Sequence, residues 1–183
     1  MEKTMARQTF LTTPNLDLIM HSADDAVKLT SWFNTGLVTQ YLARGDNPMS
    51  EQSESQYLEK LYQTEADLQL GIWHREDKKL IGTTGLHNIH PRDRKATFGI
   101  LIGEPDYWSR GYGTETLQAM LNWAFMVRDL RRVTLSVFGN NPRGQKCYEK
   151  CGFTEIGRYP KHIYKNGEWQ DEVLMMASNP MYT

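Results

Sequence analysis

Residues 109–116, with the sequence SRGYGTET, have the composition of a phosphate-binding turn. Gly111 and Gly113 stand at the junction between an apolar run, residues 98–102, and a segment whose apolar residues recur at helical spacing. The first turn of a helix exposes unpaired backbone N–H groups and carries a partial positive charge, so glycines that admit a ligand there create an anion site. The turn therefore predicts that the chain holds a phosphate group.

Two familiar phosphate-binding patterns do not fit this turn. A Walker A loop ends in Gly-Lys-Ser or Gly-Lys-Thr, which the string lacks, so nucleotide hydrolysis is not predicted. A dinucleotide fingerprint needs a third glycine where Thr116 stands, and it usually opens a fold rather than following residue 100. On the turn alone, a tight turn that holds no ligand remains the alternative.

Length and composition bound the class of protein. A chain of 183 residues with 39% hydrophobic residues and a formal net charge of −1 fits one globular domain, residues 1–183. No apolar stretch approaches the roughly 20 residues that span a bilayer, and the N-terminus lacks the apolar core of a signal peptide, so we expect a cytoplasmic protein without a membrane partner. With 21 basic against 22 acidic residues, no nucleic-acid partner is expected.

The phosphate turn lies between elements that the apolar patterns predict to form a mixed sheet. Three strand-like runs with short charged turns between them predict an antiparallel meander, at residues 68–74, 79–89 and 95–102. The amphipathic helix after the turn reaches Arg128 and leads to a strand at residues 133–138, so the connection is a crossover between parallel strands. Ligands favour the carboxyl ends of such strands.

Turn and cap residues bound the remaining elements. Asn141 as N-cap, Pro142 at the first helical position and Gly152 after the last turn predict a helix of about ten residues. Asn166-Gly167 predicts a type I′ hairpin near the end of the chain. The other expected elements are a strand at residues 16–20, a helix at 23–33 and a helix from Ser50 to about Glu65.

Cysteine and histidine spacing indicates no metal or disulfide. Cys147 and Cys151 lie four apart in one predicted helix, where a disulfide is geometrically disfavoured, so we expect small core-facing residues. His87 and His90 lie three apart on a predicted strand, which would put them on opposite faces of the sheet and argues against a shared metal site.

The combined pattern resembles the GNAT superfamily of acyl-CoA-dependent N-acyltransferases. The strings WSRGYGTE, YEKCGF and IYKNGEWQDEVLM look like the branch that contains RimJ/RimL-type N-terminal protein acetyltransferases and spermidine acetyltransferases. This resemblance implies an α/β fold with a mixed sheet of about seven strands, flanked by about four helices and splayed between the strands around Ile102 and Val133. Acetyl-CoA, the implied cosubstrate, would enter the splay, and a homodimer is common among such relatives.

The resemblance also implies roles for particular residues. Backbone N–H groups near Leu101 and Ile102 would stabilise the oxyanion, and Tyr148 would act as the general acid that protonates the departing thiolate. Asn141 would cap its helix, contact CoA, or do both. The positions expected to bind the cofactor are Leu101, Ile102, Ser109, Arg110, Gly111, Tyr112, Gly113, Thr114 and Asn141.

Three residues depart from the pattern of the superfamily. Trp108 stands where Gln or Arg is usual, and Ser109 replaces a common glycine. Thr97 matters more, because many relatives carry a glutamate there, two residues before the glycine that matches Gly99. A base could still come from Glu104, His87 or a relayed water, and Glu104 is the named candidate.

The missing glutamate bears on the acceptor. A lysine-like amine has a pKa about 2.6 units above that of an α-amine, which corresponds to roughly 3.5 kcal/mol of deprotonation. We therefore expect acetyl transfer to a weakly basic primary amine such as a protein or peptide N-terminus. A small amine, either a polyamine or an antibiotic, is the alternative acceptor, and a non-catalytic acyl-CoA-binding sensor is the alternative function.

Overall fold

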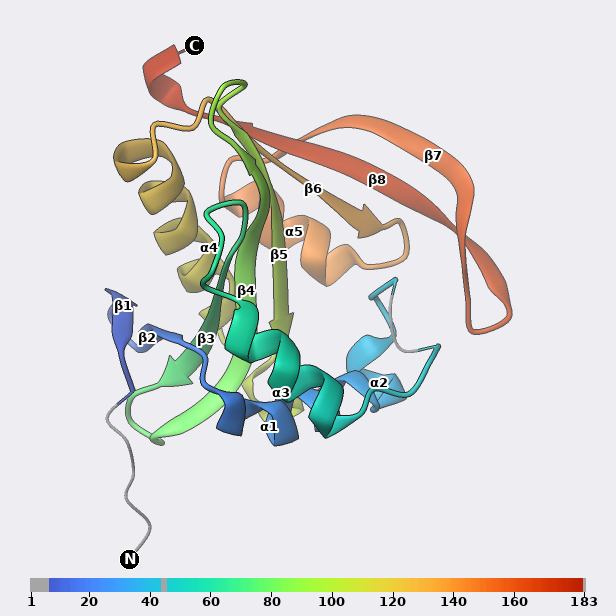
Figure 1. The fold of residues 1–183 in the computed structure, drawn as a ribbon. Coiled ribbons are helices and arrows are strands. Elements are labelled where there is room, and N and C mark those ends of the chain that lie inside the picture. Colours follow the sequence, from blue (N-terminus) through green and yellow to red (C-terminus); the bar gives the residue numbers. More distant parts are fainter. Residues whose placement is uncertain (1–6, 44–45, 183) are drawn as a thin grey trace, which may run out of the picture.

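An eight-stranded mixed sheet forms the centre of the computed structural model, which describes residues 7–43 and 46–182 (Figure 1). The spatial order is β1-β2-β3-β4-β5-β6-β8-β7. The strands are β1 (Thr9–Thr12), β2 (Leu16–Met20), β3 (Leu68–His74), β4 (Lys79–His90), β5 (Lys95–Ile102), β6 (Arg132–Phe138), β7 (Thr154–Lys165) and β8 (Glu168–Ser178). The mixed α/β class is confirmed. The sheet has one strand more than expected because β1 is a short, largely exposed edge strand without an apolar pattern.

Five α-helices flank the sheet, against about four expected. They are α1 (Ala26–Phe33), α2 (Gly36–Thr39), α3 (Glu51–Lys60), α4 (Tyr112–Asn122) and α5 (Pro142–Lys150). The additional helix, α2, is a single turn between the two segments that the sequence predicts to be helical, residues 23–33 and the helix from Ser50. Ser50 caps α3 through its hydroxyl, which accepts from the Ser53 N–H at 3.2 Å.

The predicted connections are present. Strands β2 to β5 form an antiparallel meander, and α4 crosses from β5 to the parallel strand β6. Asn166 and Gly167 have φ values of +53° and +85°, as a type I′ turn requires. Asn141 caps α5 by accepting from the Gly144 N–H at 3.0 Å, and Gly152 ends this helix with a φ of +88°.

Each face of the sheet is covered by its own hydrophobic cluster. One cluster contains the apolar stripe of α4, with Leu117 and Met120 fully buried against the sheet. The other joins α1 and α3 to the opposite face, where Leu29 and Trp32 pack with Leu101 of β5. Helix α4, which begins at the phosphate turn, and helices α1 and α3 therefore lie on opposite sides of one sheet.

The sheet splays between β5 and β6. These strands pair only from Lys95 to Thr97 on β5, opposite Arg132 to Thr134 on β6. Beyond this point β6 stays paired with β8 along its whole length, while β5 stays with β4. The expected splay is confirmed, and from Gly99 to Ile102 strand β5 has a paired neighbour on one side only.

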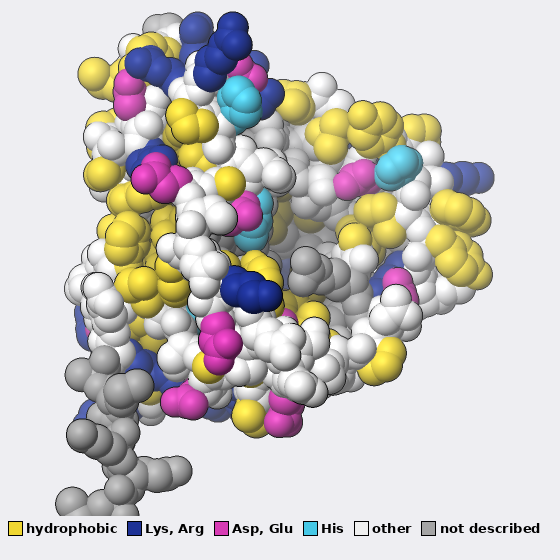
Figure 2. All heavy atoms as spheres, viewed as in Figure 1, with side chains coloured by type: hydrophobic (Ala, Val, Ile, Leu, Met, Phe, Trp, Pro, Cys, Tyr) yellow, Lys and Arg dark blue, Asp and Glu magenta, His cyan; other side chains and the backbone are white. Residues whose placement is uncertain are grey.

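The long hairpin of β7 and β8 arches away from the rest of the sheet (Figure 1). Figure 2 shows hydrophobic side chains gathered over this part of the molecule. Tyr159, Tyr164 and Trp169 are each at least 50% exposed on it. Within residues 7–43 and 46–182, no helix is long and apolar enough to span a bilayer.

Candidate functional site

A cleft of about 440 Å³ occupies the splay and passes from the phosphate turn to helix α2. Its volume lies in the range of small-molecule and cofactor sites. Strand β5 forms one wall and strand β6 the other. The lining residues are Val38, Tyr41, Leu42, Gly99, Ile100, Leu101, Ile102, Tyr107, Trp108, Ser109, Gly111, Gly113, Thr114, Ser136, Val137, Asn141, Arg143, Gly144, Lys146, Cys147, Tyr148 and Lys150.

The phosphate turn presents backbone N–H groups at the mouth of this cleft. Ser109 and Gly111 both have positive φ values, +61° and +90°, and successive turns of this kind make the main chain concave toward an anion. Gly113 follows in the first turn of α4, where a Cβ would lie 3.6 Å from the Cys147 sulfur. This cradle, with Arg143 and Lys146 beside it, fits the pyrophosphate of a CoA molecule.

All but two of the sequence-predicted cofactor positions line the cleft. The exceptions are Arg110 and Tyr112. The Arg110 guanidinium lies 5.6 Å from the ring centre of Tyr107, and the Tyr112 hydroxyl is 2.9 Å from Nε2 of His74. The Tyr112 side chain is thus engaged by His74, and the Arg110 side chain lies over Tyr107, which itself lines the cleft.

Trp108 connects the turn to the cleft wall. Its indole N–H donates to the Ile102 carbonyl at 2.7 Å, and the Arg143 guanidinium stacks on its ring with 4.3 Å to the centroid. The residue that departs from the superfamily pattern therefore fixes the end of β5 and aligns a cation at the cleft.

Tyr148 points into the cleft from the second turn of α5. Burial, with a smaller contribution from the neighbouring Cys147 thiol, raises the pKa of its phenol above the ordinary value. Among the residues that the structure describes, none forms a hydrogen bond with this hydroxyl. The hydroxyl is therefore protonated and available to a ligand at neutral pH.

One of the two cysteines differs from its expected placement. Cys151 is half-buried against the core, as predicted, but Cys147 lines the cleft and approaches the Thr114 hydroxyl at 3.4 Å. Residues four apart share one face of a helix, and this face of α5 packs against Thr114 in the first turn of α4. That turn borders both the cleft and the core, so one cysteine faces each. A hydrogen bond from Cys151, followed by one from Thr114, lowers the pKa of Cys147.

Glu104 lies beside the cleft rather than in its lining. Its carboxylate accepts from the Trp32 indole N–H at 2.9 Å and pairs with Lys28 and Lys79, each at 2.5 Å. Burial opposes ionisation of Glu104, but these contacts outweigh it and lower the pKa to about 2. A carboxylate held in this way accepts a proton poorly, so its geometry favours positioning of Trp32; its role as a base stays a prediction.

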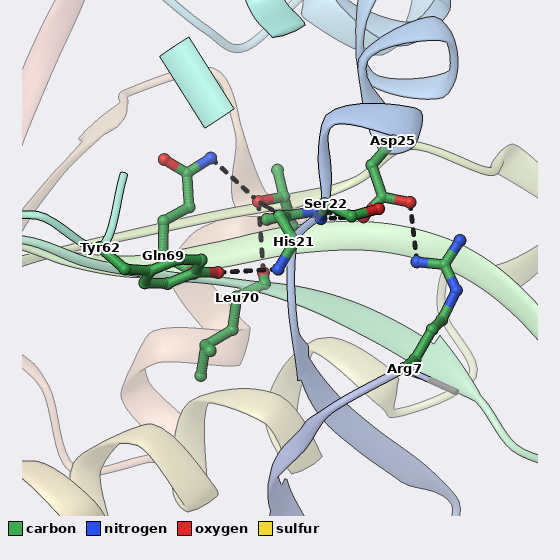
Figure 3. A network of polar contacts seen from close by, with 8 residues as sticks. Arg7, His21, Ser22, Asp25, Tyr62, Gln69 and Leu70 are labelled. Atoms are coloured by element: carbon green, nitrogen blue, oxygen red, sulfur yellow. Dashed lines mark hydrogen bonds and ion pairs between the residues drawn. The ribbon is translucent and has the colours of Figure 1, made fainter. Parts of the chain in front are cut away.

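A buried polar network lies under α1, on the face of the sheet that α1 and α3 cover (Figure 3). Both ring nitrogens of His21 are engaged: Nδ1 lies 3.0 Å from Asp25, and Nε2 lies 3.1 Å from the Thr83 hydroxyl. Arg7 donates to the other Asp25 oxygen at 2.7 Å. Burial raises the pKa of Asp25, but hydrogen bonds from His21 and Arg7 outweigh burial and lower it. The network ties the start of α1 to the sheet.

The expectation that His87 and His90 occupy opposite faces is wrong. His87 pairs with Thr97 and His90 with Lys95, and residues two apart on β5 share a face. A bulge at Asn88, which has a φ of +52°, inserts one residue between the histidines and returns His90 to the face of His87. In the described part of the chain, no three His, Cys, Asp or Glu residues gather as a metal site.

Several lining residues were not expected from the sequence. Ser136 on β6 and Val38 on α2 gave no motif signal, since only the splay and the fold of the intervening loop bring them to the cleft. Tyr41 lines the cleft, whereas Trp32 packs on Gly103 and Tyr57 donates to Gln69 at 2.8 Å. The aromatic residues of this region thus divide between lining and packing.

Comparison with known proteins gives consistent matches. Residues 15–154 match the model of the acetyltransferase (GNAT) domain. YoaA of Bacillus subtilis, named an uncharacterized N-acetyltransferase, is 30% identical over 172 residues, covering 93% of this chain and 97% of that protein. YdaF of the same organism, whose name describes a ribosomal N-acetyltransferase, is 30% identical over 97 residues, covering 53% of this chain and 52% of that protein.

Spermidine acetyltransferases are also similar to this chain. The spermidine N(1)-acetyltransferase of Vibrio cholerae is 31% identical over 105 residues, covering 57% of this chain and 60% of that protein. The crystal structure of spermidine N-acetyltransferase from Vibrio cholerae in complex with CoA and spermine has a TM-score of 0.82 at 25% identity, covering 92% of this chain and 98% of that chain. With the splayed sheet and the phosphate turn, these matches show that the chain belongs to the GNAT family as an N-acetyltransferase that uses acetyl-CoA.

Proposed function

We propose that the chain transfers the acetyl group of acetyl-CoA directly to the α-amine at the N-terminus of a protein or peptide. The observation that carries this proposal is the chemistry of the acceptor end of the cleft. Val38, Tyr41 and Leu42 close that end, and in residues 7–43 and 46–182 no aspartate or glutamate lines the cleft. A polycationic acceptor is best held by carboxylates, whereas a single weakly basic amine is not dependent on them.

The wall residues supply the other requirements of direct transfer. Strand β5 is unpaired on its β6 side beyond Thr97, so main-chain N–H groups near Leu101 and Ile102 are available to an oxyanion. Tyr148, protonated and facing the cleft, is the proposed general acid for the CoA thiolate. The main chain of residues 109–114 is the proposed pyrophosphate site, with Asn141 beside it.

A polyamine is the second candidate acceptor. It is supported by the relatives, since the similar Vibrio cholerae structure contains spermine and that protein is named for spermidine. Several acidic side chains on the acceptor side of this chain are engaged by cations, as Asp46 is by Lys165 at 3.0 Å and Glu104 by Lys28 and Lys79. Because these acidic residues are already paired with lysines, they are less available to hold a polyamine, and this favours an α-amine as the acceptor.

An acceptor panel tests the proposal. Release of CoA from acetyl-CoA is measured with N-terminal peptides, spermidine, spermine, aminoglycosides and free amino acids, against a control without acceptor. A peptide turned over at least ten times faster than any polyamine supports the proposal, and preference for a polyamine overturns the acceptor assignment. Confirmed acetyl-CoA binding with no acceptor used by the protein favours the alternative of an acyl-CoA sensor.

A further inference from the structure

His87 lies at the point where β5 and β6 part. It stands on β4 opposite Thr97, the last β5 residue that pairs with β6. Gly85 lies opposite Gly99, which lines the cleft, and Gly99 is two residues from Leu101 in the hydrophobic cluster under α1 and α3. Because paired residues and residues two apart share a face, these positions form one patch of the sheet on the α1–α3 side of the cleft.

The imidazole of His87 lies over the two glycines of this patch. A Cβ added at Gly85 would lie 3.1 Å from Nε2, and a Cβ added at Gly99 would lie 3.5 Å from the same atom. A Cβ at Gly85 would crowd the ring, and one at Gly99 would be in van der Waals contact with it, so Nε2 lies directly over these two glycines of the sheet. The side chain is 38% exposed, so that an acceptor can reach it and a proton can leave to solvent.

Asp67 lies within ion-pair distance of the other ring nitrogen, Nδ1. Its Oδ1 lies 3.6 Å from Nδ1 of His87 and accepts from the Asn88 N–H at 2.9 Å, which fixes the carboxylate. A carboxylate at Nδ1 favours the tautomer with its proton there and leaves the lone pair on Nε2. Among described residues, Asp67 is the one charged group within ion-pair distance of the ring; His90 and Lys95 lie further along the same face.

Other titratable groups on this side of the sheet are already engaged. Glu104 is paired with two lysines and has a pKa of about 2. His21 uses both ring nitrogens, one toward Asp25 and one toward Thr83, and is buried (Figure 3). His87 combines a partly exposed ring, an Nε2 with no hydrogen-bond partner among residues 7–43 and 46–182, and a place beside the cleft.

We infer that His87 is the general base that takes a proton from the acceptor amine, and that Asp67 is its positioning residue. This inference rests on the proposed acetyl transfer. His87 Nε2 removes one of the three ammonium protons, and the freed nitrogen lone pair forms the C–N bond to the thioester carbonyl. When the C–S bond breaks, Tyr148 protonates the sulfur and regains a proton from the same nitrogen. The amide keeps the third proton, and His87 releases the first to water.

The choice of base matches the proposed acceptor. Free imidazole and an α-amine have ordinary pKa values about 1.3 units apart, so proton transfer is unfavourable by only about 20-fold. For a lysine-like amine the difference is about 3.9 units, or about 8,000-fold. Proton transfer to an imidazole is therefore about 400-fold less unfavourable from an N-terminal α-amine than from a lysine-like amine.

The test compares His87→Gln and His87→Asn with His90→Gln. His90 is a matched control because it lies on the same face, is also exposed and also has an aspartate nearby, Asp93 at 3.5 Å. We expect both His87 variants to lower kcat about 100-fold or more, to lose the acidic limb of the kcat/KM profile and to bind acetyl-CoA as the wild type does. Asp67→Asn should shift that limb, and His90→Gln should stay within twofold of wild type.

Each result decides the inference independently of the acceptor. The profiles use whichever acceptor the wild type turns over best, so preference for a polyamine refutes the proposed acceptor while the His87 comparison still stands. His87 variants within threefold of wild type, with an unchanged pH profile, would overturn the inference. Thermal unfolding and acetyl-CoA titration separate loss of folding from loss of chemistry, and partial rescue of the His87→Asn variant by added imidazole supports the assignment. A wild type that binds acetyl-CoA but acetylates nothing refutes both proposals.

Discussion

Replacement of Glu104 by glutamine should lower stability at neutral pH without removing catalysis. The amide oxygen of Glu104→Gln can still accept from the Trp32 indole, but the ion pairs with Lys28 and Lys79 are lost. A pKa lowered from 4.5 to about 2 corresponds to roughly 3 kcal/mol if the whole shift is counted. Both lysine side chains are 40% exposed, so solvent screening reduces the expected loss to about 1–2 kcal/mol.

The pH dependence of this loss has a definite sign. Because the pKa of Glu104 is lower in the folded protein, the carboxylate stabilises the fold fully above about pH 4.5 and progressively less down to about pH 2. The stability difference between wild type and Glu104→Gln should therefore shrink to roughly 40% of its neutral value at pH 3. Added salt should shrink it as well, since the pairs are partly exposed.

Urea unfolding of both proteins at pH 7, 5 and 3 measures this difference, and acetyl transfer at pH 6 to 9 measures the catalytic consequence. We expect the pH–rate profile of Glu104→Gln to retain the shape of the wild-type profile. A stability difference that does not change between pH 7 and pH 3 would refute the ion-pair reasoning. Loss of the acidic limb together with a fall of 100-fold in kcat would instead identify Glu104 as the base, as the sequence candidate had it.

Two further substitutions test the acid and the packing beside the cleft. Tyr148→Phe should lower kcat by about 10²–10⁴-fold while acetyl-CoA binding, measured by titration calorimetry, stays within threefold of wild type; an unchanged kcat would remove Tyr148 from the mechanism. Gly103→Ala would bring a Cβ within 2.0 Å of the Trp32 ring, so we expect thermal unfolding to report a loss of about 1–3 kcal/mol. An alanine variant as stable as wild type would show that Trp32 moves freely.

Local sequence signals predicted an element correctly where its backbone conformation requires a particular type of residue. Asn141 and Gly152 bound α5 because a side-chain acceptor and a residue tolerant of positive φ are required at those two ends. The hairpin at Asn166-Gly167 follows for the same reason. The glycine turn also opens helix α4 as expected, and Ser109 has a positive φ although the common glycine is absent there.

Features that depend on cross-strand register could not be read from spacing. The bulge at Asn88 changes which face His90 occupies, and nothing in the local pattern of β4 marks it. Helix α4 continues into a π-helical turn, Trp123–Val127, although its apolar spacing fits a regular helix. The contact of Glu115 with Thr13 and Asn15 joins segments about 100 residues apart. In none of these cases does the local pattern of the segment mark the feature.

The difference between local and distant determinants explains why one part of the cleft was predictable and the other was not. The predictable part is the donor side, where acetyl-CoA is proposed to bind, and the other is the acceptor side, where the amine is proposed to bind. The donor side depends on main-chain geometry at residues 109–114, which glycine positions reveal. The acceptor side depends on how far β6 departs from β5, and β6 follows β8 and the arched hairpin rather than its parallel neighbour. That departure brings Val38 and Tyr41, from one segment, and His87, from another, toward one opening. We therefore expect acceptor choice to depend on the sheet topology together with side chains of residues 36–42 and of β4, and substitutions in these two segments to alter it while leaving acetyl-CoA affinity unchanged.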